Sequence, residues 1–240
     1  MSSSSRRTVI VAGTAGLAAL GLGLGVLEAA PAADRDARRL ANRLELWGTF
    51  ARKSSQNLLA RYTSTRTSPL LAEELVGSGA LAFVAPGTLV LRDDSATGST
   101  TRIEPSEVAH VPGDPVGREI AIVPNDPSLP RRAMPPPSRA PALRWLADHL
   151  VACFAPGDGT ALTADARVEV PRGRSPRLSL MPPRDSPARA MIRSVTLTLD
   201  QVGGAVLRVE IAESDGGSFV LAIADHRQNV AADLLARVLE

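Results

Sequence analysis

The feature that most constrains the fold is a regular alternation of apolar and polar residues in the C-terminal part of the chain. Between residues 162 and 170, every second side chain is apolar, and the intervening ones are Thr, Asp, Arg and Glu. Segments 177–181, 192–199, 205–212 and 218–224 continue the pattern. Successive side chains of a strand point to opposite faces, so this pattern predicts antiparallel strands with one face in water and the other on a core.

Turns and further elements complete this prediction. Gly203-Gly204 and Asp215-Gly216-Gly217 have the composition of hairpin turns. Further strands are predicted at 55–66, 77–86 and 88–93, with weaker ones at 99–103 and 108–111, and helices at 34–53, 141–154 and 230–239. The sequence thus predicts an α+β fold, mainly antiparallel β. We expect an incomplete curved β-barrel with helices covering the concave face.

The first 32 residues have the organisation of an export signal. A short polar start ends in Arg6-Arg7, residues 9–27 carry no charge, and a run of small residues follows. The arginine pair partly resembles a twin-arginine signal. Cleavage after Ala32 would leave residues 33–240 as one domain, with a proline-rich insert at about 112–141. The alternative is an uncleaved membrane anchor, because the uncharged stretch is long enough to span a bilayer.

Charge and composition argue against several functional classes. A net charge of +2 is too small for a nucleic-acid-binding face. A single cysteine excludes a disulfide framework and a thiolate zinc site. The three histidines, His110, His149 and His226, match no metal or catalytic-triad spacing. We therefore predict a protein that is not an enzyme, with no catalytic residues, no cofactor, no metal and no nucleic-acid partner.

Three further groups are interpreted as structural. The neighbours Asp148-His149 and Asp225-His226 cannot face each other on a helix or a strand, so we interpret them as surface polar residues. Cys153 lies on the apolar side of its predicted helix and is expected to be a buried, unreactive thiol. All seven aromatic residues fall within predicted elements, as parts of either a packed core or the wall of an apolar cavity. The sequence leaves these two alternatives open.

The order of these elements resembles a known family. Gly79-Ala-Leu-Ala-Phe-Val-Ala-Pro-Gly-Thr-Leu-Val-Leu91 is followed by Leu178-Ser-Leu-Met-Pro182, strand 192–199 and a hairpin at 206–223 around Asp215-Gly216. This order resembles the periplasmic outer-membrane lipoprotein carriers, the LolA-like family. Ala85 stands where the family often has an arginine, and Leu91 stands where an aromatic residue is common. The chain therefore resembles a divergent member.

The resemblance implies a function and a set of partners. It implies a monomeric periplasmic carrier that shields the acyl chains of a lipoprotein or lipid in an apolar cavity during transfer to the outer membrane. An inner-membrane donor complex and an outer-membrane acceptor would be its partners. The alternative is a sensor or accessory subunit of the same fold that transports nothing and binds an envelope protein. The candidate cavity residues are Trp47, Phe50, Tyr62, Phe83, Leu89, Leu91, Leu146, Leu180, Val195, Leu197, Leu199, Val209 and Ile211.

Overall fold

The computed structural model describes residues 32–53, 56–70, 72–95, 98–104, 107–111, 123–124 and 140–239. Apart from Ala32, the predicted export signal lies outside these residues, together with the twin-arginine and anchor alternatives. Most of the predicted insert at 112–141 lies outside them too. The described residues from Ala32 onward belong to one compact unit.

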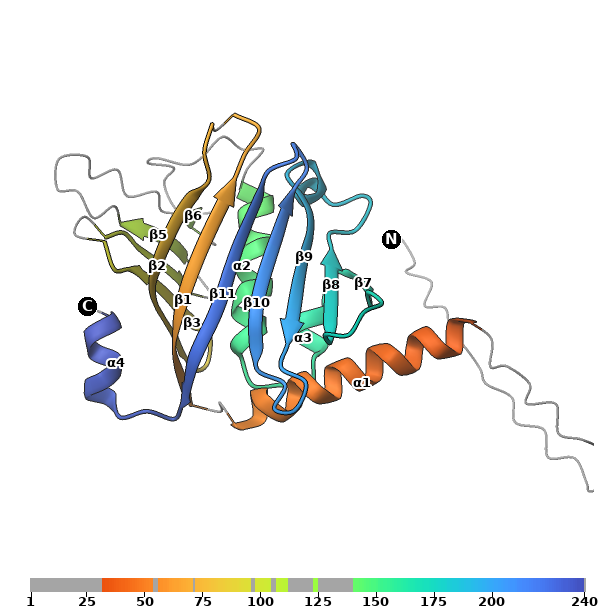
Figure 1. The fold of residues 1–240 in the computed structure, drawn as a ribbon, viewed down its shortest axis with the longest axis horizontal. Helices are drawn as coiled ribbons and strands as arrows, with labels where there is room; N and C mark the ends of the chain where they lie inside the picture. Colours follow the sequence, from red (N-terminus) through yellow and green to blue (C-terminus); the bar gives the residue numbers. More distant parts are fainter. Residues whose placement is uncertain are drawn as a thin grey trace, which may run out of the picture. The chain divides into compact units, whose positions relative to one another are not determined.

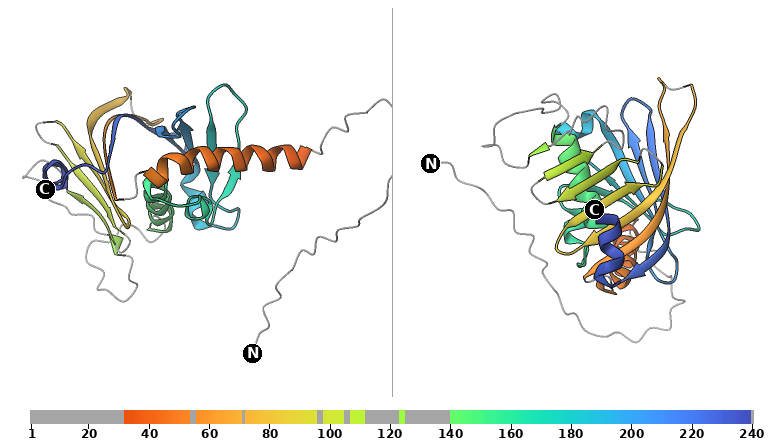
Figure 2. Two further views of the ribbon diagram at one scale, coloured as in Figure 1. Left: turned by 90° about the horizontal axis from the view of Figure 1, so that it is seen from below. Right: turned by 90° about the vertical axis from the view of Figure 1, so that its left-hand side faces the viewer.

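Eleven strands form one antiparallel sheet (Figure 1). Their order across the sheet is β6-β5-β4-β3-β2-β1-β11-β10-β9-β8-β7. The strands are β1 (Asn57–Thr67), β2 (Leu75–Val84), β3 (Thr88–Asp93), β4 (Thr100–Glu104), β5 (Glu107–Val111), β6 (Val123–Pro124), β7 (Arg167–Glu169), β8 (Arg177–Met181), β9 (Ile192–Leu199), β10 (Val206–Glu213) and β11 (Ser218–Gln228). The sheet curves but keeps free edges at β6 and β7, so it is not closed into a barrel (Figure 2).

The predicted alternation places one row of side chains in the core. In β9, Val195, Leu197 and Leu199 are buried, while Thr196 and Thr198 between them are only partly buried. The same period of two appears across the centre of the sheet, where β1 pairs with β11. The concave face is therefore lined with aliphatic side chains, as the sequence predicts.

Helices cover that concave face (Figures 1 and 2). The helices are α1 (Ala32–Lys53), α2 (Ala140–Phe154), the short α3 (Thr160–Thr163), the 3-10 helix η2 (Pro187–Ala190) and α4 (Ala232–Leu239). The long helix α1 runs along one end of the sheet, and α2 crosses its concave face. The predicted α+β class and the helices on the concave face are confirmed. In the described part of the chain, no helix is both long enough and apolar enough to cross a bilayer.

The prediction of a continuous strand from 162 to 170 is wrong. Residues 160–163 form the helical turn α3, and only Arg167–Glu169 pair as a strand. The backbone of Asp165 has φ 48°, which interrupts an extended chain. Leu162 is fully buried from within its helical turn. Leu162 is therefore apolar because it packs in the core from a helical turn, and not because it belongs to a strand.

The prediction that one face of the sheet lies in water holds only for part of the outer face. Helix α4 covers part of that face over β2 and β3. A second, smaller cluster forms there between the helix and the sheet. Its buried members are Ala80, Ala82, Val90, Leu235 and Val238. The small side chains of Ala80 and Ala82 on the outer side of β2 allow the helix to approach the sheet closely.

Candidate functional site

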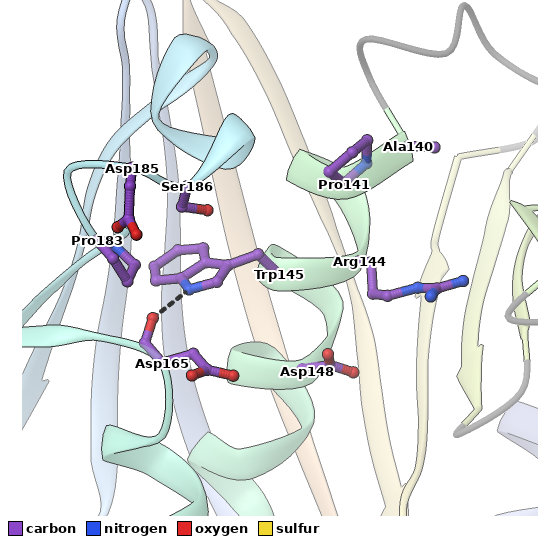
Figure 3. Close-up of a pocket in the computed structure, with 9 residues that line it drawn as sticks. All are labelled: Ala140, Pro141, Arg144, Trp145, Asp148, Asp165, Pro183, Asp185 and Ser186. Atoms are coloured by element: carbon purple, nitrogen blue, oxygen red, sulfur yellow. Dashed lines mark hydrogen bonds between the residues drawn. The ribbon is translucent and has the colours of Figure 1, made fainter. Parts of the chain in front are cut away.

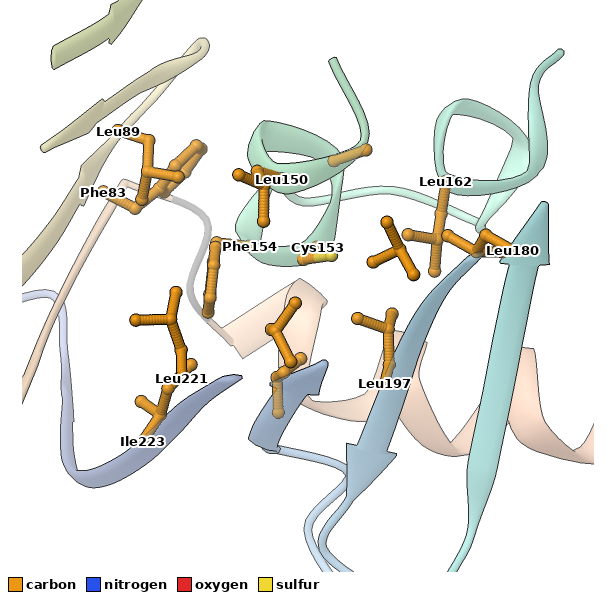
Figure 4. Packing of buried hydrophobic residues seen from close by; sticks show 14 of the residues in the cluster. Phe83, Leu89, Leu150, Cys153, Phe154, Leu162, Leu180, Leu197, Leu221 and Ile223 are labelled. Carbon is orange, nitrogen blue, oxygen red and sulfur yellow. The ribbon is translucent and has the colours of Figure 1, made fainter. Parts of the chain in front are cut away.

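The predicted cavity residues come together on the concave side of the sheet (Figure 4). They reach this place from α1, from α2 and from strands on both sides of the β1–β11 pair. All of them are buried except Leu91 and Leu146, which are partly buried and pack against the same cluster. Whether they also contact a lipid remains a prediction.

Helix α2 is the element that fills the concave face. Its buried side includes Ala142, Leu150 and Phe154, which belong to the same apolar cluster as the sheet residues. Among the described residues, only His149 and Ser179 are buried polar side chains. The layer between the helix and the sheet is therefore almost entirely apolar.

Hydrogen bonds hold α2 along its side and at its C-terminal end. The Trp145 indole N–H donates to the Asp165 carbonyl at 2.9 Å, and the Trp47 indole N–H donates to the Cys153 carbonyl at 2.9 Å. His149 Nε2 lies 3.0 Å from the carbonyl oxygen of Ala164. These bonds run to α1 and to the segment after α3, whereas the helix meets the sheet through apolar contacts.

A pocket of about 280 Å³ opens beside the first turns of α2. Ala142, Ile192 and Ile211 line this pocket and also belong to the buried cluster. We call it the rim pocket. Its lining residues are Arg66, Ala142, Leu143, Leu146, Ala190, Met191, Ile192, Ile211, Glu213 and Asp215. Its floor is continuous with the apolar layer on the concave face.

The sequence predicted only part of the rim pocket. Leu146 and Ile211 were candidate cavity residues, whereas Leu143 and Met191 were missed. The apolar stripe of α2 could have indicated Leu143, but no sequence pattern places Met191 beside that helix. Charged residues lie at the edge, where Arg66 is 3.6 Å from Glu213.

A second pocket of about 540 Å³ lies on another side of α2 (Figure 3). The Trp145 indole forms one wall, and Asp148, Asp165 and Asp185 surround it. Burial raises the pKa of Asp148, while His149 and Arg144 oppose this shift. Three carboxylates line this pocket and none of the predicted cavity residues does, so it is a poor candidate for an acyl chain.

Tyr62, one of the predicted cavity residues, packs tightly in the buried apolar cluster. A Cβ atom at Gly79, its neighbour across the strands, would lie 2.0 Å from the Arg92 carbonyl oxygen and 2.6 Å from the Tyr62 hydroxyl oxygen, so both require glycine there. Burial, followed by the carboxylates of Asp93 and Asp94, raises the pKa of Tyr62 to about 12. The phenol is therefore neutral at physiological pH.

Two of the groups interpreted as structural can now be placed. His149 is buried, so the interpretation of this residue as a surface group is wrong. It turns inward because its ring stacks on Trp145, with centroids 4.0 Å apart. Cys153 is fully buried, as expected, and burial raises the pKa of its thiol. No group of three or more potential metal ligands occurs within the described ranges.

The fold and the site together define an open antiparallel half-barrel with a helix-covered apolar face. No family model matches the chain, and no curated protein matches it in sequence. Among solved structures, the chain is similar to a LolA superfamily protein from Nitrosomonas europaea. The identity is 12%, 81% of this chain and 96% of that chain are covered, and the TM-score is 0.39.

Two further solved structures are similar to this chain. One is a domain assigned as an outer membrane lipoprotein-sorting protein from Vibrio parahaemolyticus, with 11% identity, coverage of 86% of this chain and 98% of that chain, and a TM-score of 0.41. The other is lipoprotein LppX from Mycobacterium tuberculosis, with 13% identity, coverage of 82% and 98%, and a TM-score of 0.39. The fold assignment rests on the strand order, because likenesses this weak carry no argument about ligands.

Proposed function

We propose that this protein is a periplasmic carrier that shields the acyl chains of a lipoprotein or lipid during transfer to the outer membrane. The observation that carries the proposal is the continuity between the rim pocket and the apolar layer beneath α2. Ile192 and Ile211 belong to both. An acyl chain that passes the charged edge of the rim pocket would extend between the helix and the sheet along apolar side chains.

The energetics of an acyl chain support this role. Each CH₂ group gains about 0.8 kcal/mol on leaving water, so a chain of about sixteen carbons is held in a membrane by roughly 12 kcal/mol. A carrier has to offer comparable apolar surface. Leu180, Val195, Leu197 and Val209 on the concave face are fully buried and would provide such a surface only if α2 moved away from them.

The attachment of α2 is suited to loading and release. The hydrogen bonds described above hold α2 at Trp145, His149 and Cys153, in the middle and at the end of the helix. The first turn, with Ala142 and Leu143, borders the rim pocket. An acyl chain that enters from the rim pocket would therefore meet α2 at its first turn.

A binding experiment tests the carrier function. Protein purified without detergent is extracted with organic solvent for bound lipid, and its binding of a fluorescent fatty acid is titrated. We expect Leu146→Asp to weaken fatty-acid binding at least about tenfold, because it places a carboxylate in the rim pocket. The matched control is Leu207→Asp, whose side chain is already exposed on β10. Repeated preparations without lipid, combined with no fatty-acid binding, would contradict the proposal.

The alternative function is an accessory subunit that binds an envelope protein. The observation that favours it is the tip of the β1–β2 hairpin, where Leu70, Leu75 and Val76 are 92%, 56% and 74% exposed. Neighbouring exposed apolar side chains often mark protein contacts. Recovery of a stoichiometric protein from envelope extract, lost in Leu70→Ser/Val76→Ser and accompanied by no lipid, would favour this role over transport.

The location and the domain organisation belong to the same proposal. Residues 1–32 would direct export, and residues 33–240 would act in the periplasm as one LolA-like lipid-carrier domain, as a monomer between a donor complex and an acceptor. N-terminal sequencing of the protein recovered from the envelope tests this. A start at Ala33 indicates cleavage, whereas an intact N-terminus in the membrane fraction indicates an anchor.

A further inference from the structure

A separate groove lies on the outer face of the sheet, where α4 meets strands β1, β2 and β11. It has a volume of about 280 Å³ and is distinct from the rim pocket on the concave side. Leu59, Ala80 and Val238 provide an apolar lining, and Leu234 at the edge is 36% exposed. We call it the outer groove. Its lining residues are Leu59, Ala60, Arg61, Ala80, Asp225, Arg227, Leu234, Arg237 and Val238.

The strand register places two arginines around this apolar lining. Arg61 pairs with Ala80 across β1 and β2, and Leu59 pairs with Arg227 across β1 and β11. Leu59 and Arg61 share one face of β1. Directly or diagonally opposed residues on one face of neighbouring strands have Cβ atoms within about 8 Å of each other. The two guanidinium groups therefore flank the same apolar surface.

The third arginine comes from α4. Arg237 lines the groove from the last turn of the helix. Its backbone carbonyl accepts a hydrogen bond of 2.6 Å from Arg92 Nη1, which fixes this turn against β3. The helix thus holds a cationic side chain opposite the two on the sheet.

The charges in the outer groove are not balanced. Arg61 forms a two-bond ion pair with Asp94. For the guanidinium groups of Arg227 and Arg237, the structure gives no hydrogen bond or ion pair within its described residues. Asp225 is the only carboxylate that lines the groove. Two unpaired cations facing one apolar surface favour an anion with an attached apolar group.

We propose that the outer groove binds the phosphate group of a small phosphorylated amphiphile. A phosphate monoester carries about −1.5 to −2 charges at pH 7, and the guanidinium groups of Arg227 and Arg237 outnumber the single lining carboxylate, Asp225. The planar fork of arginine bonds phosphate oxygens in pairs. Leu59, Leu234 and Val238 would contact the first carbons of the attached chain. The site lies on the opposite face from the concave apolar layer and does not depend on acyl transport.

Calorimetric titration of the full chain with hexyl phosphate, inorganic phosphate and 1-hexanol tests this site. We expect hexyl phosphate to bind more tightly than either of the other two. Arg227→Gln and Arg237→Gln should each weaken it about tenfold. The control is Arg208→Gln on β10, an exposed arginine outside the groove, which should bind as the wild type does. Leu234→Gln should weaken hexyl phosphate but not inorganic phosphate.

The same titration separates this proposal from the carrier function. Leu146→Asp, which would impair acyl binding, should leave hexyl phosphate binding unchanged. Co-sedimentation with vesicles containing phosphatidic acid, compared with phosphatidylcholine alone, identifies the source of the phosphate. Arginine-dependent binding to the first vesicles indicates a lipid headgroup, and binding of hexyl phosphate only indicates a soluble compound. Hexyl phosphate that binds no better than 1-hexanol, or equally to the Arg227→Gln/Arg237→Gln variant, would overturn the proposal.

Discussion

The indole N–H of Trp47 donates a hydrogen bond of 2.9 Å to the carbonyl oxygen of Cys153, and both residues are buried. Cys153 lies in the last turn of α2, where backbone carbonyls have no partner within the helix. The bond therefore satisfies an otherwise unpaired buried oxygen. It also fixes the end of α2 to α1, so that only the opposite end of the helix borders the rim pocket.

Trp47→Phe should remove this bond and leave the Cys153 carbonyl buried without a partner. We expect the free energy of unfolding to fall by about 1–3 kcal/mol in a urea titration. The matched variant is Trp145→Phe, which removes an indole bond of the same length at a less buried place and should cost less. Equal stability of Trp47→Phe and the wild type would show that this bond does not hold α2.

Leu197→Asp should prevent stable folding, because it places a carboxylate at a fully buried position on the concave face. We expect the free energy of unfolding to fall by about 4 kcal/mol or more. Circular dichroism should detect this as a much lower melting temperature. Thr198→Asp is the control on the same strand. Its side chain points to the outer face, beside Arg177 and Arg208 on the neighbouring strands, so it should melt near the wild type. Similar melting of both variants would mean that the inward face is assigned incorrectly.

The thiol of Cys153 should make stability fall at alkaline pH. Burial raises its pKa in the folded protein, so only the unfolded chain releases the proton as the pH passes about 8.5. Below that pH, the thiol makes its full contribution to the stability of the folded state. Above it, the free energy of unfolding should fall by about 1.4 kcal/mol per pH unit. Urea titrations between pH 8 and 9.5 should show a smaller decline in Cys153→Ala. Parallel curves for both proteins would contradict the assignment.

His226 should have the opposite effect at acidic pH. Burial lowers its pKa in the folded state, although the Val206 carbonyl, Asp225 and Asp200 oppose this. Because its pKa is lowered, the contribution of neutral His226 to stability is fully present above about pH 6.5. This contribution is lost at lower pH, where the unfolded chain takes up a proton more readily than the folded protein does. His226→Gln, which keeps a donor for the Val206 carbonyl, should flatten the loss of melting temperature between pH 6.5 and 5. An unchanged pH profile would count against a titrating His226.

Local sequence patterns predicted most elements, because the period of two and the helical spacing reflect which face of an element is buried. Strands β8 and β9 have the predicted boundaries, and α2 begins one residue earlier than predicted. The prediction failed at residues 162–170, where hydrogen bonds from Trp145 and His149 bind the backbone of Ala164 and Asp165. These bonds join distant segments, and no local pattern contains them.

By itself, the sequence determined that an apolar face exists and which residues form it, since burial of alternate side chains drives the sheet to present them on one side. Only the tertiary structure decided what covers that face and where it opens. Helix α2 brings Leu143 and Leu146 beside Met191, and α4 brings Arg237 to the side of the sheet that carries Arg61 and Arg227. A pocket depends on segments that are distant in sequence, so its position follows from packing and strand register rather than from the periodicity of any single segment.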